Sequence, residues 1–379
     1  MFSGFKHSLS TLSVCILCLL IPYSCTDTEE PDCCEEMPSF ENTPFDRKAL
    51  LKSWADDIII PSFERYVKSL TVLNDRATDL TNDPSMASLE NLRESWLDAY
   101  SSWQSVSMFD IGMAETIGLR NFTNIFPTDV DKINETLNRD SYNLGLPSNF
   151  VVQGFPALDY LLFAFTGEEL MQNKLVNTKY TDYISTLTER LLMLSSDVLS
   201  DWKSSYRDEF IRNDASSATG SVDKLVNDAL FYYEKFLRAG KIGIPAGVFS
   251  GTPISDAVEA PFSKIYSKQL FLAGLGHFKN FLNGELTNGT ISDTHLGTYL
   301  DAVNAEKDGT ALITLMNKQL DEAKLLGERL SDNFQDQVET DNIKMLQTYD
   351  ELQKAVVLLK VDMLQALNIK VDFVDADGD

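Results

Sequence analysis

Apolar residues recur every three or four positions along most of the chain. One regular stripe contains Val222, Leu225, Val226, Ala229, Leu230, Tyr233, Phe236 and Leu237. Another contains Ile343, Leu346, Tyr349, Leu352, Val356, Leu359 and Met363. Because an α-helix turns once in 3.6 residues, both stripes predict helices with one apolar face.

Similar stripes predict further helices along the chain. They cover residues 48–80, 87–110, 152–165, 178–211, 258–283 and 309–331. No series of short alternating segments joined by hairpin turns competes with them. The pattern therefore predicts an all-α fold, and its long helices favour antiparallel bundles.

Two packed helical bundles are expected, with the boundary after residue 172. The segments LRESWLDAYSSWQ and VLSDWKSSYRDEF resemble each other, which suggests that an up-and-down bundle is duplicated. We assign residues 45–172 to the N-terminal bundle and residues 173–379 to the C-terminal bundle. A length of 379 residues also favours two domains over one small core.

The first 44 residues predict export and anchoring. Lys6 precedes an apolar run from Leu9 to Ile21, which has the length of a signal-peptide core. Ser24 and Cys25 follow, and the next residues are acidic and polar. This resembles a bacterial lipoprotein signal, so we expect a signal peptide at 1–24, acylation of Cys25 and a flexible tether at 25–44.

The charge balance narrows the choice of partners. The chain has 57 acidic residues against 32 lysines and arginines, and its formal net charge is −25. Such a surface repels phosphate backbones, so we expect no nucleic-acid binding. It suits cations or basic partners, and it equally suits a well-solvated secreted protein.

The sequence offers no common enzyme motif. It contains no HExxH, GxSxG, Walker or GxGxxG pattern in a suitable context. After the signal peptide only His277 and His295 remain, and neither has a second candidate ligand at helical spacing. A zinc hydrolase is therefore disfavoured, because its metal is usually held by three protein ligands that include histidine.

The segment QGFPALDYLLF, residues 153–163, places an acid inside a strongly apolar run. Pro156 suits the first turn of a helix after Gly154, and the helix dipole favours Asp159 near that end. Apolar residues on more than one side of the segment indicate burial. A buried carboxylate needs a hydrogen-bonding partner or a cation.

A second acid stands in a similar context. Glu259 is expected at the opening of a helix, and Tyr266 and Ser267 follow two turns later. Asp159 and Glu259 together would supply oxygen ligands for a hard cation such as iron(III), calcium or magnesium. Alternatively, each acid stabilises its own helix and the two never meet.

The chain resembles the imelysin family over nearly the whole body that follows the tether. The resemblance rests on the order and spacing of IIIPSFERY, LRESWLDAYSSWQSVSMFDIG, GFPALDYLLF, KIGIPAG, EAPFSKIYSKQLF and DADGD. It implies two helical bundles with a functional site in the cleft between them. It also implies a role in iron or haem acquisition.

The family hallmark GxHxxE is altered in this chain. Its positions fall on Gly154, Pro156 and Asp159, so proline replaces the histidine and aspartate replaces the glutamate. A carboxylate cannot replace imidazole as a nitrogen ligand. The alteration therefore disfavours a metallopeptidase, although a GxPxxE-type subgroup also resembles this segment.

These observations predict a non-enzymatic lipoprotein at the outer membrane of a Gram-negative bacterium, on its periplasmic face or at the cell surface. It would bind iron, an iron complex or a component of an iron or haem transport system near Asp159 and Glu259. The oligomeric state stays open. The alternatives are a peptidase with an atypical site and a structural or adhesion lipoprotein, which would have no pocket between its bundles.

Overall fold

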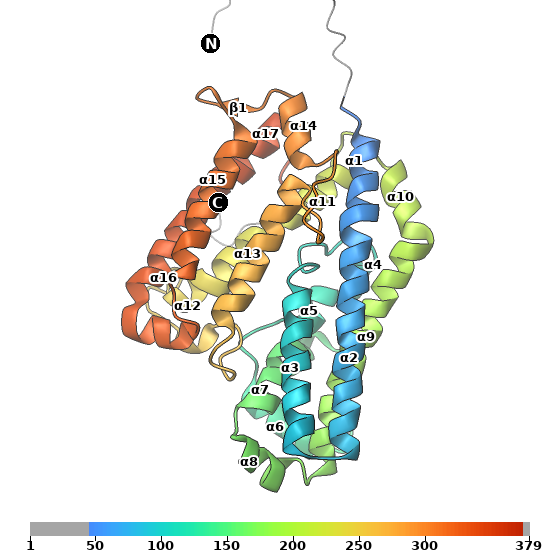
Figure 1. Ribbon diagram of the computed structural model, residues 1–379, viewed down its shortest axis with the longest axis vertical. Helices are drawn as coiled ribbons and strands as arrows, with labels where there is room; N and C mark the ends of the chain where they lie inside the picture. Colours follow the sequence, from blue (N-terminus) through green and yellow to red (C-terminus); the bar gives the residue numbers. More distant parts are fainter. Residues whose placement is uncertain (1–44, 374–379) are drawn as a thin grey trace, which may run out of the picture. The chain divides into compact units, whose positions relative to one another are not determined.

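The predicted stripes form helices that pack into two groups (Figure 1). The computed structural model describes residues 45–373. The signal peptide, Cys25 and the tether are predictions that lie outside the described residues. Among the residues described, no single helix has the length and apolarity of a membrane span. One pair of helical segments, 147–163 and 167–174, passes that test by length and composition alone, but it is bent by 97°.

The first helix group contains α2, α3, α7 and α9, and α2 packs against both α3 and α9. Their bounds are α2 Ile60–Asn82, α3 Met86–Trp103, α7 Gly154–Phe163 and α9 Thr178–Asp201. Shorter elements lead into and connect them: α1 (Arg47–Ser53), the π-helix η1 (Trp54–Ile59), α4 (Met113–Ile117), α5 (Leu119–Thr123), α6 (Val130–Asn138), the 3-10 helix η2 (Pro147–Val152), α8 (Gly167–Glu169) and the π-helix η3 (Leu170–Lys174). After α9 the chain continues through the π-helix η4 (Trp202–Tyr206) and α10 (Arg207–Arg212).

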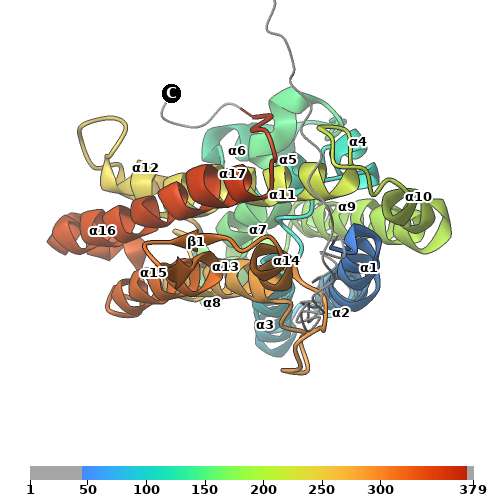
Figure 2. The same cartoon turned by 90° about the horizontal axis from the view of Figure 1, so that it is seen from above.

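The second helix group contains η5, α13, α15 and α16. Their bounds are the π-helix η5 Tyr232–Gly243, α13 Ser267–Asn283, α15 Leu312–Glu328 and α16 Phe334–Val356. The remaining elements are α11 (Ser221–Phe231), α12 (Ile244–Ala246), the 3-10 helix η6 (Ser255–Ala257), α14 (Leu296–Ala302), the π-helix η7 (Val357–Met363) and α17 (Leu364–Ala366). Figure 2 shows α15 and α16 side by side, away from α1 and α2.

The all-α prediction is confirmed, with one small exception and one correction. A two-residue antiparallel pair, β1 (Glu306–Lys307) with β2 (Thr310–Ala311), precedes α15. The helix predicted over residues 258–283 starts too early, because α13 begins only at Ser267. Residues before it form an irregular turn, in which Ala260 and Lys264 have φ values of 57° and 65°. Glu259 therefore does not open a helix.

The predicted boundary after residue 172 stays a prediction. Helix α9 follows that boundary in the chain, yet it packs against α2, which precedes it. The described residues 45–373 also belong to one compact unit. The two helix groups therefore do not separate at residue 172, because α9 belongs to the first group although it follows that residue.

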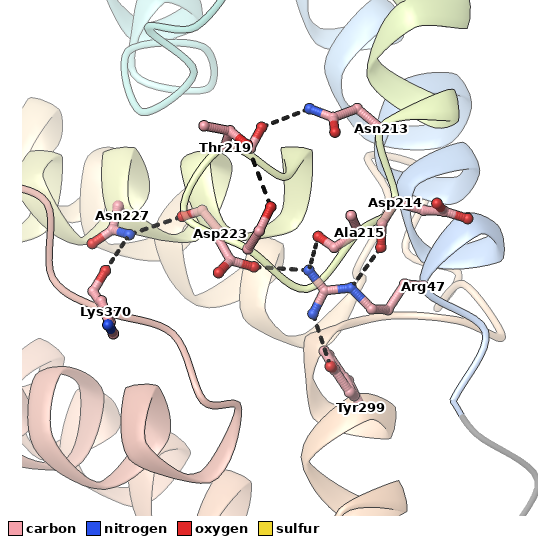
Figure 3. Close-up of polar contacts among 10 residues, drawn as sticks. Arg47, Asn213, Asp214, Ala215, Thr219, Asp223, Asn227, Tyr299 and Lys370 are labelled. Atoms are coloured by element: carbon pink, nitrogen blue, oxygen red, sulfur yellow. Dashed lines mark hydrogen bonds and ion pairs between the residues drawn. The ribbon is translucent and has the colours of Figure 1, made fainter.

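The described chain begins at a buried ionic junction around Arg47 (Figure 3). The guanidinium of Arg47 donates to Asp223 Oδ1 at 2.8 Å and to Tyr299 Oη at 3.0 Å. It also donates to the carbonyl oxygens of Asp214 and Ala215, at 3.0 and 3.2 Å. One side chain thus joins α1 to α11, to α14 and to the loop after α10.

The junction extends towards the C-terminal segment. Asn227 Nδ2 donates to the carbonyl oxygen of Asp223 at 3.0 Å and to that of Lys370 at 2.9 Å. Asn213 Nδ2 donates to the carbonyl oxygen of Thr219 at 2.6 Å and closes the neighbouring loop. The start of the body, its middle and its last described segment are therefore held at one place (Figure 3).

We expect Arg47→Met to reduce the free energy of unfolding by about 3–5 kcal/mol, because it leaves the buried Asp223 carboxylate without its cation. The side chains of Arg47 and Asp223 are only 11% and 3% exposed. The control is Arg76→Met, which removes an exposed pair with Asp79 and should cost about 0.5 kcal/mol or less. Urea denaturation of both variants tests this, and equal losses would contradict it.

Candidate functional site

Helix α7 begins at Gly154, a position where no larger residue fits. Gly154 has φ +74°, in the left-handed region that favours glycine. A Cβ atom at this position would lie 2.1 Å from the carbonyl oxygen of Thr123. Pro156 follows in the first turn, where its missing N–H removes no helix bond.

Asp159 is fully buried and holds the turn at 260–264. Its Oδ2 accepts from the backbone N–H of Phe262 at 2.9 Å, and its Oδ1 accepts from that of Ser263 at 3.0 Å. The two left-handed residues, Ala260 and Lys264, stand on either side of these contacts. The carboxylate therefore stabilises a backbone shape that non-glycine residues rarely adopt.

Burial raises the pKa of Asp159 to about 7. The two backbone hydrogen bonds oppose this shift, because they favour the charged form, while the nearby charge of Glu259 adds to it. The side chain is thus a carboxyl group that changes charge near neutral pH.

Glu259 lies in a separate buried cluster. Its Oε1 accepts from Tyr100 Oη at 2.9 Å and from Asn124 Nδ2 at 2.8 Å. Its Oε2 forms an ion pair with Lys241 Nζ, which also donates to Gln104 Oε1 at 3.0 Å. We call these residues, Tyr100, Gln104, Asn124, Lys241 and Glu259, the Glu259 cluster.

The Glu259 cluster joins the two helix groups. Tyr100 comes from α3 and Gln104 directly follows it, Asn124 follows α5, and Lys241 comes from η5. Burial lowers the pKa of Lys241, and the charge of Glu259 opposes this. Burial raises the pKa of Tyr100 well above its usual value, and Glu259 raises it further. The buried charges of Lys241 and Glu259 therefore depend on each other.

The structure brings the two predicted carboxylates into one region and gives each its own partners. Asp159 accepts from the N–H groups of Phe262 and Ser263, three and four residues after Glu259, so the two acids lie in one region. Asp159 accepts from backbone N–H groups, whereas Glu259 accepts from side-chain O–H and N–H groups, so these bonds share no donor. Over residues 45–373 no group of three or more histidine, cysteine or acidic side chains is placed to hold a metal. The proposed cation at Asp159 and Glu259 stays a prediction.

Tyr266 and Ser267 connect the turn to its surroundings. Ser267 Oγ donates to the carbonyl oxygen of Glu259 at 2.7 Å. The ring of Tyr266 packs against Trp96 and Phe163, with centroid distances of 6.1 and 6.3 Å. Ser267 therefore positions Glu259, and Tyr266 packs the end of this segment against α3 and α7.

A pocket of about 360 Å³ lies beside the turn. Pro127 and Val130 line it from the chain around the start of α6, and Gln335 lines it from α16. Phe262, whose N–H is held by Asp159, and Lys264 complete this side of it. We call this the cleft pocket, because its walls come from both helix groups. A second pocket, next to Lys241 and Gln104, has room for only about one water.

Sequence reasoning missed most of the Glu259 cluster, although one signal was available. Lys241 lies four residues after Leu237 and thus continues the apolar stripe of α11 and η5. A lysine on a buried stripe indicates a buried ion pair. Tyr100, Gln104 and Asn124 carry no such signal, because buried tyrosines and amides are common in helical cores.

The two histidines have no place in this site. His295 Nδ1 accepts from the N–H of Gly297 at 3.1 Å and caps α14. His277 lies on α13, where burial and the charge of Arg65 lower its pKa.

Comparison with known proteins identifies relatives of this chain. A family model described as Imelysin matches residues 59–360. An imelysin-like protein from Psychrobacter arcticum 273-4 has a similar structure, with a TM-score of 0.67 and 19% identity over 86% of this chain and 97% of that one. A protein from Parabacteroides distasonis ATCC 8503 is provisionally described as an iron-regulated protein A precursor. Its structure gives a TM-score of 0.68 and 17% identity over 84% of this chain and 95% of that one. No curated protein matches.

We expect Gly154→Ala to lower the free energy of unfolding by about 3 kcal/mol, since it adds about 1–2 kcal/mol of left-handed strain to about 1–3 kcal/mol of overpacking. Gly251→Ala is the matched control, because Gly251 has φ +73° and open space around its Cβ position. It should lose only the strain component, about 1–2 kcal/mol. Denaturant unfolding measures both, and a loss no larger at Gly154 would contradict the close approach to Thr123.

Asp159→Asn should flatten the dependence of stability on pH. Because the pKa of Asp159 is raised from 3.8 to about 7 on folding, the folded chain binds this proton more tightly. The stabilisation is complete below pH 3.8 and is lost as the pH rises to about 7. The wild type should therefore lose up to about 4 kcal/mol relative to the variant over this interval. Urea unfolding at several pH values checks this, and parallel profiles would contradict it.

Proposed function

The chain belongs to the imelysin family, and we propose that it is a non-enzymatic binding protein for iron or haem acquisition whose ligand occupies the cleft pocket. Acylation of Cys25 would hold it at the outer membrane, on the periplasmic face or at the cell surface. Components of an iron or haem transport system would be its partners.

The observation that carries this proposal is the buried Glu259 cluster next to the turn that forms the cleft pocket. A helical core does not need a buried ion pair, because apolar residues of similar size usually stabilise it as well or better. Buried charges beside a pocket are instead typical of functional sites. Here one turn carries Glu259 at its start and Phe262 in the pocket wall.

Two observations support iron as the ligand: the description of one relative and the oxygen donors of the Glu259 cluster. The protein from Parabacteroides distasonis is described as iron-regulated. The Glu259 cluster offers carboxylate, phenol and amide oxygens, the donor types that hard cations such as iron(III) prefer. The ammonium of Lys241 already neutralises Glu259, so a bare ion would have to displace it. An iron complex in the cleft pocket requires no such displacement and is the form that we favour.

A peptidase with an atypical site is the second candidate. The family model carries a peptidase label, and this is the observation that favours it. If the chain is a peptidase, an activity that cleaves an unfolded protein such as casein should co-purify with it. That activity should be lost in Asp159→Ala. The binding proposal predicts no cleavage by either protein.

Iron binding by the purified full chain tests the proposal. Ferric citrate and haemin are titrated separately into the wild type, Asp159→Asn and Glu259→Gln, with bound iron measured after desalting. We expect one ferric citrate per chain, because a pocket of about 360 Å³ encloses a small complex more fully than a haem. Binding should be about tenfold weaker or worse in Asp159→Asn, because its turn forms a pocket wall. Glu351→Gln, at a partly exposed ion pair on α16 outside the pocket lining, is the control and should bind as the wild type does.

The Glu259 variant separates two modes of binding. Direct coordination predicts that Glu259→Gln loses iron entirely, whereas a complex in the cleft pocket predicts that it retains most binding. Circular dichroism confirms that each variant is folded. Absence of iron and haemin binding by the wild type would overturn the proposal.

A further inference from the structure

Half of the residues that line the cleft pocket are apolar. These are Pro127, Val130, Pro261 and Phe262. Two of these are prolines, whose rings fix the backbone and present flat surfaces. The volume of about 360 Å³ lies at the lower end of the range for small-molecule sites, so it suits a molecule with one or two rings.

The aromatic wall is held in a defined orientation. The ring of Phe262 packs edge-on against Tyr160, with a centroid distance of 5.2 Å and an angle of 65°. Its backbone N–H is bound by the buried Asp159 carboxylate. Because Tyr160 packs against this ring and Asp159 holds its backbone, a second ring can stack on it without a large loss of side-chain freedom.

The polar groups of the cleft pocket are few and of different kinds. Lys264 is exposed at the rim, and its ammonium has no ion-pair partner in the part of the chain that the structure describes. Asp256 Oδ1 accepts from Gln335 Nε2 at 2.8 Å. Thr128 Oγ1 donates to the carbonyl oxygen of Val151 at 2.6 Å and keeps lone pairs for a donor.

From these contacts we infer that the cleft pocket binds a hydroxylated aromatic carboxylate. The ring would lie between Phe262 and the two prolines, and its carboxylate would pair with Lys264. Ring hydroxyls would donate to Asp256 and Thr128. An amine in place of the carboxylate would leave Lys264 without a partner and face a like charge.

The inference deepens the proposed function and rests on it in one respect. A hydroxyl next to a carboxylate on an aromatic ring chelates iron(III) through two hard oxygens. Such an acid would be the organic part of the bound iron complex. The hydroxyl that chelates iron is then deprotonated, so the hydrogen bonds to Asp256 and Thr128 belong to the metal-free acid or to hydroxyls at other ring positions. Recognition of the acid itself depends on the pocket walls and on Lys264, and it can be tested without iron.

Salicylate, benzoate and cyclohexanecarboxylate are the probes, each titrated into the purified full chain without metal. Saturation-transfer NMR detects contact, and calorimetry gives affinity. We expect salicylate to bind most tightly and cyclohexanecarboxylate at least about tenfold more weakly, because it lacks a flat ring and hydroxyl. Lys264→Met should weaken salicylate binding at least about tenfold, since it removes the ammonium and keeps the side-chain length.

Lys268→Met is the matched control. Lys268 lies four residues further along and pairs with Asp332, outside the pocket lining, so its loss should leave salicylate binding unchanged. Phe262→Leu provides a second test, which should weaken salicylate more than cyclohexanecarboxylate. Equal affinities for the ring types, or salicylate binding unaffected by Lys264→Met, would overturn the inference.

The two proposals can fail separately. Salicylate binding without any iron uptake leaves this inference standing and removes the role in iron acquisition. Binding of ferric citrate or haemin by a chain that does not bind salicylate supports the role in iron acquisition and overturns this inference.

Discussion

The candidate site depends on one contact, the buried carboxylate of Asp159 against the backbone of the turn at 260–264. Its oxygens accept two adjacent N–H groups, between two residues in the left-handed conformation. These bonds offset part of the strain of the turn, together with those of Ser263 Oγ to the carbonyl oxygen of Ala260 and of Ser267 Oγ to that of Glu259. Because the same turn carries Glu259 inwards and Phe262 towards the cleft pocket, this one interaction positions both halves of the site.

The two carboxylates of the site have different physical roles. Asp159 is bound by backbone groups, has its pKa raised by burial and shapes the chain around it. Glu259 is bound by side chains from several segments and is neutralised by Lys241. A side chain that holds a backbone turn is suited to shaping a wall, whereas a buried ion pair links the helix groups that supply its partners. The roles of the residues around Asp159 are consistent with this: Gly154 allows the close approach to Thr123, Pro156 lies in the first turn of α7 and Asp159 holds the turn at 260–264.

Charged groups also tie the molecule together away from the site. Arg47 joins the start of the chain to three later segments, and the bonds of Asn227 extend this junction to residue 370. Each such group is costly to bury alone and stable only with its partners. The Arg47 junction and the Glu259 cluster therefore each join parts of the chain that are distant in sequence. Apolar packing alone would join these parts less specifically.

The sequence by itself determined the all-α class, most helix positions, the helix start at Gly154 and Pro156 and the burial of Asp159. Helical periodicity, turn residues and a lone acid in an apolar run are local signals. The sequence placed the start of the helix after Glu259 wrongly, since residues 258–266 have an apolar pattern but are held in a turn by a side chain about a hundred positions earlier. It also missed Tyr100, Gln104, Asn124 and Lys241 as partners of Glu259. Only the tertiary structure decided these contacts and the cleft pocket, because they join residues that are far apart in the chain and that no local pattern relates.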